Sequence, residues 1–375
     1  MKKRVALIQN RVQPGGRFQV MAEMIFVLNE KEIIPDILCF RSRLNADKVA
    51  AFYGKELKYN VVLVDAPPKL PFEWNIWWFN KKVSALLGDY DWVINHNNTS
   101  YGLKTTTAIL SYIHFPRKAR LMSGLKDVHF PEKGKTPLVN AGKDLLNMMR
   151  WFYRRDTKFL PNDTLIANSE FTKSKILEVY PSIEGSTVEV LYPPVKFSSK
   201  VNWSQKTKKV VSLGRFAGAK RQLEQIKIAA QLPHIPFTFI GFISEPDYFS
   251  KCKQFIEDKE VRNIKILSDA SKEDLEKELK EAWFFIHSMR NEPFGITPVQ
   301  AIEAGCIPVV HNSGGQKEIV IKDELRYKDK KDAVSVLNRV FSKPESELKS
   351  LSQILIANAE QFDAAGFRER FGQMI

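Results

Sequence analysis

The stretch Trp283–Val320, which reads WFFIHSMRNEPFGITPVQAIEAGCIPVVHNSGGQKEIV, decides the fold of this chain. Residues 283–287 and 306–310 are short apolar runs, typical of strands that are buried on both faces of a sheet. A polar loop and then a helical pattern follow each run. Two such connections side by side place two helix N-termini, with their unpaired N–H groups, at one edge of a parallel sheet. That edge is where such sheets bind phosphate groups.

The first helix of this stretch carries its own start and stop signals. We expect Thr297 to be the N-cap, Pro298 the first helical residue and Gln300 the third position of a capping box. Gly305 is expected to end the helix. Glu292 precedes the helix, so the pattern places its carboxylate beyond the carboxyl end of the first strand.

Length and composition predict two domains of the α/β class. The chain has 375 residues, more than one typical domain, and its hydrophobic content of 44% is enough for two cores. In both halves apolar runs alternate with helical patterns, which favours two doubly wound parallel sheets. Pro193, Pro194 and the polar run 198–209 predict a domain boundary near residue 195.

Cysteine usage and the lengths of the apolar runs indicate the compartment. Cys39, Cys252 and Cys306 lie in apolar runs without the spacing of metal ligands, so we expect buried thiols in a reducing compartment. The first apolar run stops at Gln9, which is too short for a signal peptide, and no run approaches a membrane span. We therefore expect a cytoplasmic protein, either free or peripheral on the cytoplasmic face of a membrane.

Positive charge and aromatic residues gather in two segments. The net charge is +14, and segments 74–82 and 148–158 interleave aromatic residues with lysine or arginine. Such segments suit an anionic membrane surface or a nucleic acid. Because no recognised nucleic-acid module is present, we predict a membrane surface or a lipid-linked ligand and no nucleic acid. The alternative, in which these aromatic residues fill a core while the charges stay solvated, remains open.

Two features of the first half point to a ligand. A strand at 4–9 is followed by a turn with Gly15 and Gly16 and by a helix at 18–30, so the backbone of the turn can approach a ligand beside a helix N-terminus. His114 ends an apolar segment before a proline. Without further information, a histidine there is more often a hydrogen-bonded structural residue than a catalytic one.

The second half contains a pair of cations at the start of a helix. The segment GRFAGAK follows a strand at 210–213 and carries Arg215 and Lys220. An arginine fork and a lysine point charge can together hold a diphosphate, although an exposed basic helix start is the alternative in so basic a chain. Gly241 and Ser268 lie at the ends of later strands, where we expect a nucleotide base.

Seven motifs of the chain resemble, in the same order, segments of one enzyme family. They are Gly15-Gly16, YIHFP at 112–116, NSEFT at 168–172 with Ser169 as a predicted N-cap, YPPV at 192–195, GRFAGAK at 214–220, NEPFG at 291–295 and HNSGG at 311–315. The family is the retaining nucleotide-sugar glycosyltransferases of family 4, and the resemblance is greatest to its dolichol-pathway mannosyltransferases. It implies the GT-B fold, with two Rossmann-like domains facing across a cleft and a last helix that crosses back.

The resemblance also implies that the two domains bind different substrates. Residues 1–195, joined by a C-terminal helix at about 348–375, would bind the acceptor, and residues 196–347 the nucleotide-sugar donor. The implied site residues are Glu292 and His114 for catalysis; Arg215, Lys220, Gly295 and Ile296 for the donor diphosphate; Glu292, Phe294 and Gly295 for the donor sugar; Gly15 and Gly16 for the donor and acceptor loop; and Gln300 for the ribose.

Gln300 departs from the family motif, which has a second glutamate at this position. An amide can still hydrogen-bond a ribose, and the alternative is that Gln300 only caps its helix. Cations and helix N-termini at the leaving diphosphate imply a reaction that needs neither a metal nor a cofactor. No second carboxylate is evident as a covalent nucleophile, so the scheme of retaining hydrolases does not fit.

The sequence therefore predicts an enzyme that transfers a hexose, with mannose as the first candidate. The donor is a GDP- or UDP-linked sugar and the acceptor is a lipid-linked or free saccharide. Two alternatives stay open: a GT-B sugar-nucleotide epimerase, and a catalytically weakened subunit that only binds the nucleotide sugar.

Overall fold

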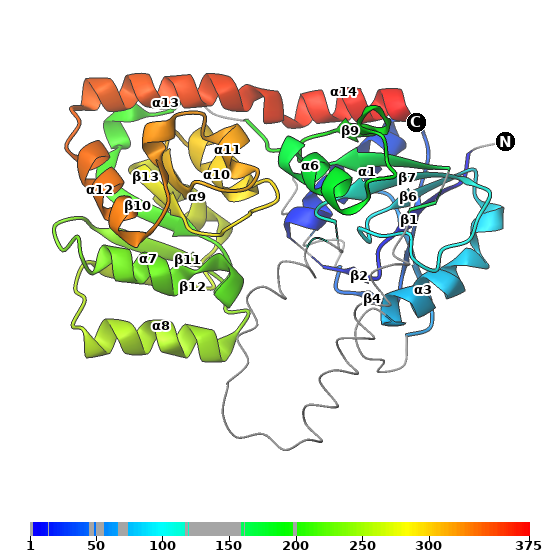
Figure 1. Ribbon diagram of the computed structural model, residues 1–375, viewed down its shortest axis with the longest axis horizontal. Coiled ribbons are helices and arrows are strands. Elements are labelled where there is room, and N and C mark those ends of the chain that lie inside the picture. The colour runs from blue at the N-terminus through cyan, green and yellow to red at the C-terminus, as the bar shows by residue number, and fades with distance from the viewer. Residues whose placement is uncertain are drawn as a thin grey trace, which may run out of the picture. The chain divides into compact units, whose positions relative to one another are not determined.

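Two compact units make up the chain. The computed structural model describes residues 3–13, 15–44, 49, 56–66, 74–116, 119, 159–160, 162–197 and 201–375, so Pro14 and the basic aromatic segment 148–158 lie outside the described residues. One unit comprises Met1–Tyr192 and Phe367–Ile375, and the other Pro193–Gly366 (Figure 1). Of the expected returning segment 348–375, only the last part belongs to the first unit.

A parallel sheet of seven strands forms the centre of the first unit, in the order β5-β3-β1-β6-β7-β8-β9. The order runs outward in both directions from β1 and β6, as in a doubly wound sheet, and confirms the predicted class. The strands are β1 Val5–Ile8, β3 Asp36–Cys39, β5 Asn60–Leu63, β6 Trp92–Asn95, β7 Ala108–Ile113, β8 Asp163–Ala167 and β9 Val188–Val190, with a separate pair of β2 Arg11–Val12 and β4 Arg41–Ser42.

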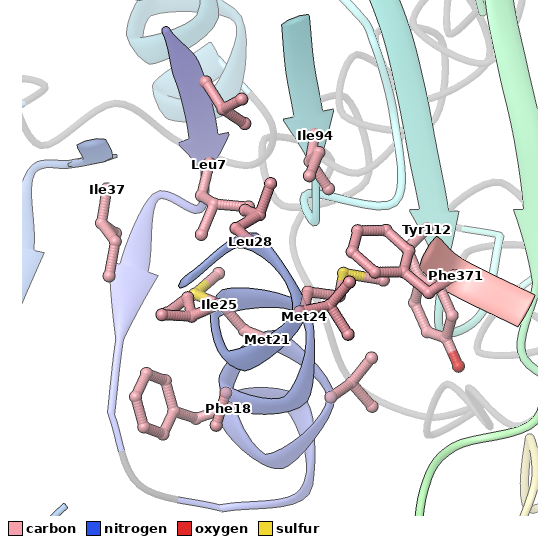
Figure 2. Packing of buried hydrophobic residues seen from close by; sticks show 14 of the residues in the cluster. Leu7, Phe18, Met21, Met24, Ile25, Leu28, Ile37, Ile94, Tyr112 and Phe371 are labelled. Atoms are coloured by element: carbon pink, nitrogen blue, oxygen red, sulfur yellow. The ribbon is translucent and has the colours of Figure 1, made fainter. Parts of the chain in front are cut away.

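Helix α1 (Gly16–Glu30) is the centre of the largest core of the first unit. Its sequence is apolar around most of the circumference because the helix packs both on the sheet and on α14 (Ala364–Met374). Figure 2 shows this core, in which Phe18, Met21, Met24, Ile25 and Leu28 of α1 meet Leu7, Ile37, Ile94 and Tyr112 of the sheet and Phe371 of α14. The unit also contains α3 (Trp74–Ser84) and α6 (Glu170–Val179).

The second unit repeats the doubly wound plan with six parallel strands in the order β12-β11-β10-β13-β14-β15. Here the order reverses between β10 and β13. The strands are β10 Thr207–Leu213, β11 Phe237–Gly241, β12 Ile264–Ser268, β13 Ala282–His287, β14 Ile307–His311 and β15 Arg326–Tyr327. The helices are α7 Gln222–Ala229, α8 Pro246–Asp258, α9 Lys272–Glu281, α10 Ile296–Glu303, α11 Gln316–Ile319, α12 Lys330–Phe341 and α13 Glu345–Ala359.

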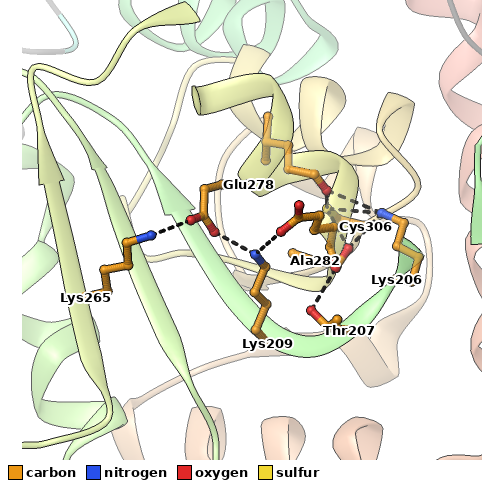
Figure 3. Close-up of polar contacts among 9 residues, drawn as sticks. Lys206, Thr207, Lys209, Lys265, Glu278, Ala282 and Cys306 are labelled. Atoms are coloured by element: carbon orange, nitrogen blue, oxygen red, sulfur yellow. Dashed lines mark hydrogen bonds and ion pairs between the residues drawn. The ribbon is translucent and has the colours of Figure 1, made fainter. Parts of the chain in front are cut away.

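A lysine network ties together the amino ends of β10 and β13 (Figure 3). The buried Lys206 donates from Nζ to the carbonyl oxygens of Leu279, Ala282 and Ala304, at 3.3, 2.7 and 2.6 Å. Two of these carbonyls lie at the C-terminal ends of α9 and α10, where a cation satisfies acceptors that the helix leaves unpaired. Beside it, Lys209 pairs with Glu278 at 2.7 Å and Glu281 at 3.0 Å, and Lys265 with Glu278 at 2.8 Å.

Candidate functional site

The strand order of the second unit indicates that the loops after β10 and β13 form the candidate site. Where the order of a parallel sheet reverses, the connections on either side leave in opposite directions, and ligands bind at the carboxyl ends of the strands. The loop after β10 carries Lys220 and the loop after β13 carries Glu292. Lys220 Nζ lies 2.7 Å from Glu292 Oε2, and the two side chains are 23% and 13% exposed. The fold therefore pairs two residues that are 72 positions apart in the sequence.

His287 is a further member of this cluster that the sequence analysis missed. It is the last residue of β13, and its ring Nε2 lies 3.0 Å from the same Glu292 Oε2. Its side chain is buried, at 3% exposed. The available signal was a single polar residue at the end of an otherwise apolar strand, five positions before Glu292, which by itself does not distinguish a structural histidine from a functional one.

Burial and charge determine the protonation states in this cluster. Burial alone would raise the pKa of Glu292, but the Lys220 ammonium and the His287 hydrogen bond lower it well below its ordinary value. Burial also lowers the pKa of His287, although the hydrogen bond to Glu292 acts to raise it. Glu292 is therefore ionised and only accepts hydrogen bonds, so the neutral His287 ring carries its hydrogen on Nε2.

The loop after β14 holds the backbone of Glu292. Gly315 N donates to Glu292 O at 2.8 Å, and Asn291 N donates to Ser313 Oγ at 2.9 Å. Gly314 has a φ of +78°, and a Cβ atom there would lie 2.5 Å from Glu292 O and 2.6 Å from Glu292 N. Only glycine permits this approach at position 314. A Cβ atom at Gly315 would lie 2.3 Å from Pro293 O, which explains the second glycine of the HNSGG motif.

A buried glutamine joins the same two loops. Gln316 Nε2 donates to the carbonyl oxygens of Met289, His311 and Ser313, at 3.0, 2.7 and 3.0 Å. Sequence reasoning did not identify Gln316, because its partners are backbone atoms whose positions depend on how β13 and β14 pair.

The start of α10 differs from the prediction. The helix begins at Ile296 with Gly295 as N-cap, and no side chain caps it, so the capping box expected at Thr297 and Gln300 is wrong. The backbone of Gly295 has a φ of 120°, a conformation that glycine adopts readily and other residues rarely do. The helix therefore begins two residues before Pro298, the residue predicted to start it. Gln300 therefore lies in the second turn and is half-buried, without the capping role.

The remaining predicted donor residues lie at the same carboxyl edge. Arg215 follows β10, is exposed, and its guanidinium has no hydrogen-bond or ion-pair partner among the described residues. Gly241 ends β11, where a Cβ atom would lie 2.0 Å from Gly214 O, so the loops after β10 and β11 touch. Ser268 ends β12, pairs in register with Gly241 and is exposed.

Phe294, which was predicted to lie at the donor sugar, has a buried side chain. It is 2% exposed and packs edge to face on Phe362, with ring centroids 5.2 Å apart. The side chain therefore belongs to the core of the second unit.

The predicted residues of the first unit also lie at a carboxyl edge. His114 follows β7, is 9% exposed, and its backbone N donates to Asn98 Oδ1 at 2.7 Å. Its ring centroid lies 5.7 Å from that of His96, a fully buried residue that the sequence analysis did not consider. The ring nitrogens of His96 have no hydrogen-bond partner among the described residues, and burial lowers the pKa of His96 to about 3. Gly15, with a φ of 142°, is the N-cap of α1, and both it and Gly16 are exposed.

The segment 74–82 forms most of α3. Its lysines lie over its tryptophan rings: Lys81 Nζ is 5.2 Å from the ring centroid of Trp77, and Lys82 Nζ is 5.2 Å from that of Trp78. Both tryptophans are half-buried. In the described part of the chain, no helix has the length and apolar composition to cross a bilayer. In the same residues, no group of three or more His, Cys, Asp or Glu side chains is placed to hold a metal ion.

Comparisons with known sequences point to one family. Residues 196–361 match the family model described as glycosyl transferases group 1. The chain is 29% identical over 240 residues to the GDP-Man:Man(3)GlcNAc(2)-PP-Dol alpha-1,2-mannosyltransferase of Mus musculus. The aligned region covers 57% of this chain and 48% of that protein. The Candida glabrata protein of the same name is 28% identical over 254 residues, covering 59% and 48%. The chain thus spans about half the length of these relatives.

Solved structures share the fold of the whole chain. Sucrose-phosphate synthase from Thermosynechococcus elongatus has a TM-score of 0.75 at 12% identity, covering 100% of this chain and 98% of that one. HepE from Anabaena, solved with UDP and glucose, has a TM-score of 0.72 at 15% identity, covering 100% and 99%. WaaG, a glycosyltransferase of lipopolysaccharide biosynthesis, has 0.73 at 14%, covering 99% of both. Residues 196–361 are therefore similar to the glycosyl transferases group 1, and the chain has the GT-B fold.

Proposed function

We propose that this chain is a retaining, metal-independent glycosyltransferase of family 4 that transfers mannose from GDP-mannose to a lipid-linked saccharide. The observation that carries the proposal is the ion pair of Lys220 and Glu292 at the point where the sheet order reverses. The names of the curated relatives, which give GDP-Man as donor and Man(3)GlcNAc(2)-PP-Dol as acceptor, support the choice of substrates.

In this proposal Lys220 and Arg215 bind the donor diphosphate. Gly295 and Ile296, at the start of α10, add the positive end of a helix and its backbone N–H groups. Stabilising the charge of a leaving group is commonly the largest single catalytic contribution, and these groups supply it without a metal. The guanidinium of Arg215, which is exposed and has no partner in the part of the chain that the structure describes, is available for this task.

Glu292 binds the transferred sugar. Its ionised carboxylate accepts hydrogen bonds from sugar hydroxyls and stabilises the positive charge that develops at the anomeric carbon. The acceptor hydroxyl attacks from the face that the diphosphate leaves, so the new glycosidic bond forms as the bond to the diphosphate breaks. A phosphate oxygen takes the acceptor proton, which completes the transfer with retention of configuration.

The nucleoside occupies the other end of the same edge. Gly241 and Ser268 border the base, and Gln300 hydrogen-bonds the ribose. The contact between the loops after β10 and β11 supports this assignment, because it continues the edge from Arg215 to β12.

We assign the acceptor to the first unit. His114, Gly15 and Gly16 lie at the carboxyl edge of its sheet, and His114 is proposed to act on the transferred sugar. The protein is proposed to be cytoplasmic and to dock on an anionic membrane through α3, whose Trp77–Lys81 and Trp78–Lys82 pairs suit the boundary between headgroups and acyl chains.

Binding experiments with defined nucleotides test the function. GDP, UDP, ADP and GDP-mannose are titrated into the protein by calorimetry, with magnesium and with a chelator. Transfer is then assayed with radiolabelled GDP-mannose and a lipid diphosphate oligosaccharide. We expect GDP to bind tightest in both buffers, and Lys220→Ala to weaken it while the exposed Lys253→Ala does not. Binding that requires magnesium would contradict the metal-independent mechanism, and tight binding without any transfer would favour the binding-subunit alternative.

A further inference from the structure

One carboxylate oxygen in the site has two hydrogen-bond donors of different kinds. Glu292 Oε2 accepts from Lys220 Nζ at 2.7 Å and from His287 Nε2 at 3.0 Å. Lys220 carries its charge on a long four-carbon stem at the end of the short 3-10 helix Gly218–Lys220, and His287 is a neutral ring at the end of a buried strand. The two donors therefore cannot have the same role.

The His287 ring is fixed by its surroundings. It lies nearly parallel to the ring of Phe285, at 12° and 6.4 Å between centroids, and its backbone pairs in register with Val310 of β14. Its carbonyl oxygen accepts from Tyr327 Oη at 3.3 Å. A side chain held on a packed strand keeps its donor in one place when a ligand enters.

The position of Lys220 depends on the ligand. If the proposed function is correct, a donor diphosphate brings at least two negative charges to the loop that carries Lys220. A carboxylate has only one, so the diphosphate competes successfully for the ammonium. Glu292 then loses its closest cation at the moment when it must bind the sugar.

Resting on the proposed function, we propose that His287 is a positioning residue for Glu292. Its Nε2–H bond holds the Glu292 carboxylate in place while Lys220 binds the donor diphosphate. A neutral donor suits this task because it does not attract the diphosphate itself. Without a sugar nucleotide, Glu292 Oε2 accepts from both the Lys220 ammonium and the His287 imidazole. Once the sugar nucleotide has bound, the imidazole alone holds the carboxylate.

The test compares three substitutions of His287. His287→Leu removes the donor, His287→Gln offers an amide N–H near the position of Nε2, and His287→Asn keeps an amide that is too short to reach Glu292. For each variant, GDP affinity is measured by calorimetry, and kcat and KM are measured with GDP-mannose. The exposed His234→Gln is the matched control.

We expect a split between binding and catalysis. His287→Leu and His287→Asn keep GDP affinity within about threefold of wild type, because Lys220 still binds the diphosphate, whereas kcat falls about 100-fold as Glu292 loses its orientation. His287→Gln recovers at least a tenth of the wild-type kcat. Should His287→Leu fail to fold, as judged by circular dichroism, His287→Asn gives the same comparison.

Three outcomes would overturn the inference. They are a wild-type kcat in His287→Asn, equal losses in all three variants, and a parallel loss of GDP affinity and kcat, which would indicate a merely structural histidine. A wild-type protein that binds no nucleotide diphosphate would overturn the proposed function together with the inference. An active wild type with unaffected His287 variants would overturn only the inference.

Discussion

At the scale of single residues, the charges of Lys220 and Glu292 have separable roles that substitution can test. Glu292→Gln keeps the size of the side chain but removes its charge, so we expect kcat to fall at least 100-fold with GDP affinity retained. Lys220→Ala removes a charge-assisted contact worth about 1.5–3 kcal/mol, and GDP affinity should fall about tenfold or more. Calorimetry and initial rates measure both. Full activity in both variants, with wild-type GDP affinity, would refute the assignment of the site.

Asp163 is a buried carboxyl group of the first unit with incomplete hydrogen bonding. Its Oδ2 accepts from Ser100 Oγ at 2.5 Å and Ser111 Oγ at 2.9 Å, and its Oδ1 has no partner among the described residues. Burial raises the pKa of Asp163 to about 7, against the lowering effect of these hydrogen bonds. The folded protein therefore holds the proton more tightly than the unfolded chain does.

Asp163 should make stability depend on pH. Its folded pKa lies above the ordinary value of 3.8, so its contribution is fully present below about pH 4 and is lost as the pH rises through 7. Between pH 5 and 8 we expect the free energy of unfolding of wild type to fall by about 2–3 kcal/mol relative to Asp163→Asn. Urea denaturation across this range measures the difference. Parallel pH curves for the two proteins would show that Asp163 ionises normally.

At the scale of elements, the loop after β14 acts as a support for the loop that carries Glu292. Gly314→Ala puts a methyl group against the backbone of Glu292 and strains a positive φ, so we expect a loss of about 1–3 kcal/mol in stability. The rate of mannose transfer from GDP-mannose should fall by a larger factor than the loss of folded protein explains. Gly366→Ala is the matched control, because it lies in α14 with open space around it and should stabilise the protein by about 0.5–1 kcal/mol. Equal effects of the two substitutions would contradict the supporting role of the loop.

Local signals predicted much of the element structure. Ser169 caps α6 as expected, accepting from Thr172 N at 2.9 Å, because this motif depends only on residues within one turn. Gly305 ends α10 as expected, with Cys306 N bonded to Ala301 O. The start of α10 was mispredicted since Thr297 and Pro298 are favourable cap residues in any context, whereas the adjacent Gly295 gains its conformation from the loop it closes.

Long-range pairing accounts for what the sequence could not predict. The role of His287 depends on a loop that returns Glu292 to the end of the same strand, and the roles of Ser313 and Gln316 depend on the pairing of β13 with β14. Motif order indicated that Lys220 and Glu292 belong to one site, but only the strand order places β10 beside β13. The short strands β9 and β15 were also missed, because three and two residues carry no detectable pattern.

At the scale of the whole molecule, the first unit is built from two distant parts of the chain. Arg368 of α14 donates from Nε to Glu23 of α1 at 2.6 Å, across 345 positions of sequence. Glu23 is buried, at 6% exposed, and the Arg368 guanidinium also lies 4.7 Å from the ring centroid of Phe26. This pair joins the end of the described chain to the helix at the centre of the first core.

Breaking this pair should destabilise the first unit. Arg368→Met leaves the Glu23 carboxylate buried without its cation, which costs about 3 kcal/mol or more. Hydrogen exchange in β1 and β6 during urea denaturation reports the change. The double variant Glu23→Gln with Arg368→Met should recover much of the loss, and the exposed Arg43→Met should have little effect. A double variant no more stable than Arg368→Met would show that packing on Phe26, rather than charge, is what matters.

The discontinuous first unit has a consequence for synthesis on the ribosome. Phe367 and Phe371 complete the core around α1, yet they emerge only after all of Pro193–Gly366 has been translated. At about 5–20 residues per second, that delay lasts roughly ten to thirty seconds. During this time the second unit, which is continuous in sequence, can fold while an apolar side of α1 stays uncovered. The unit that is translated first is therefore completed last, and its nascent form is the one that exposes apolar surface for longest.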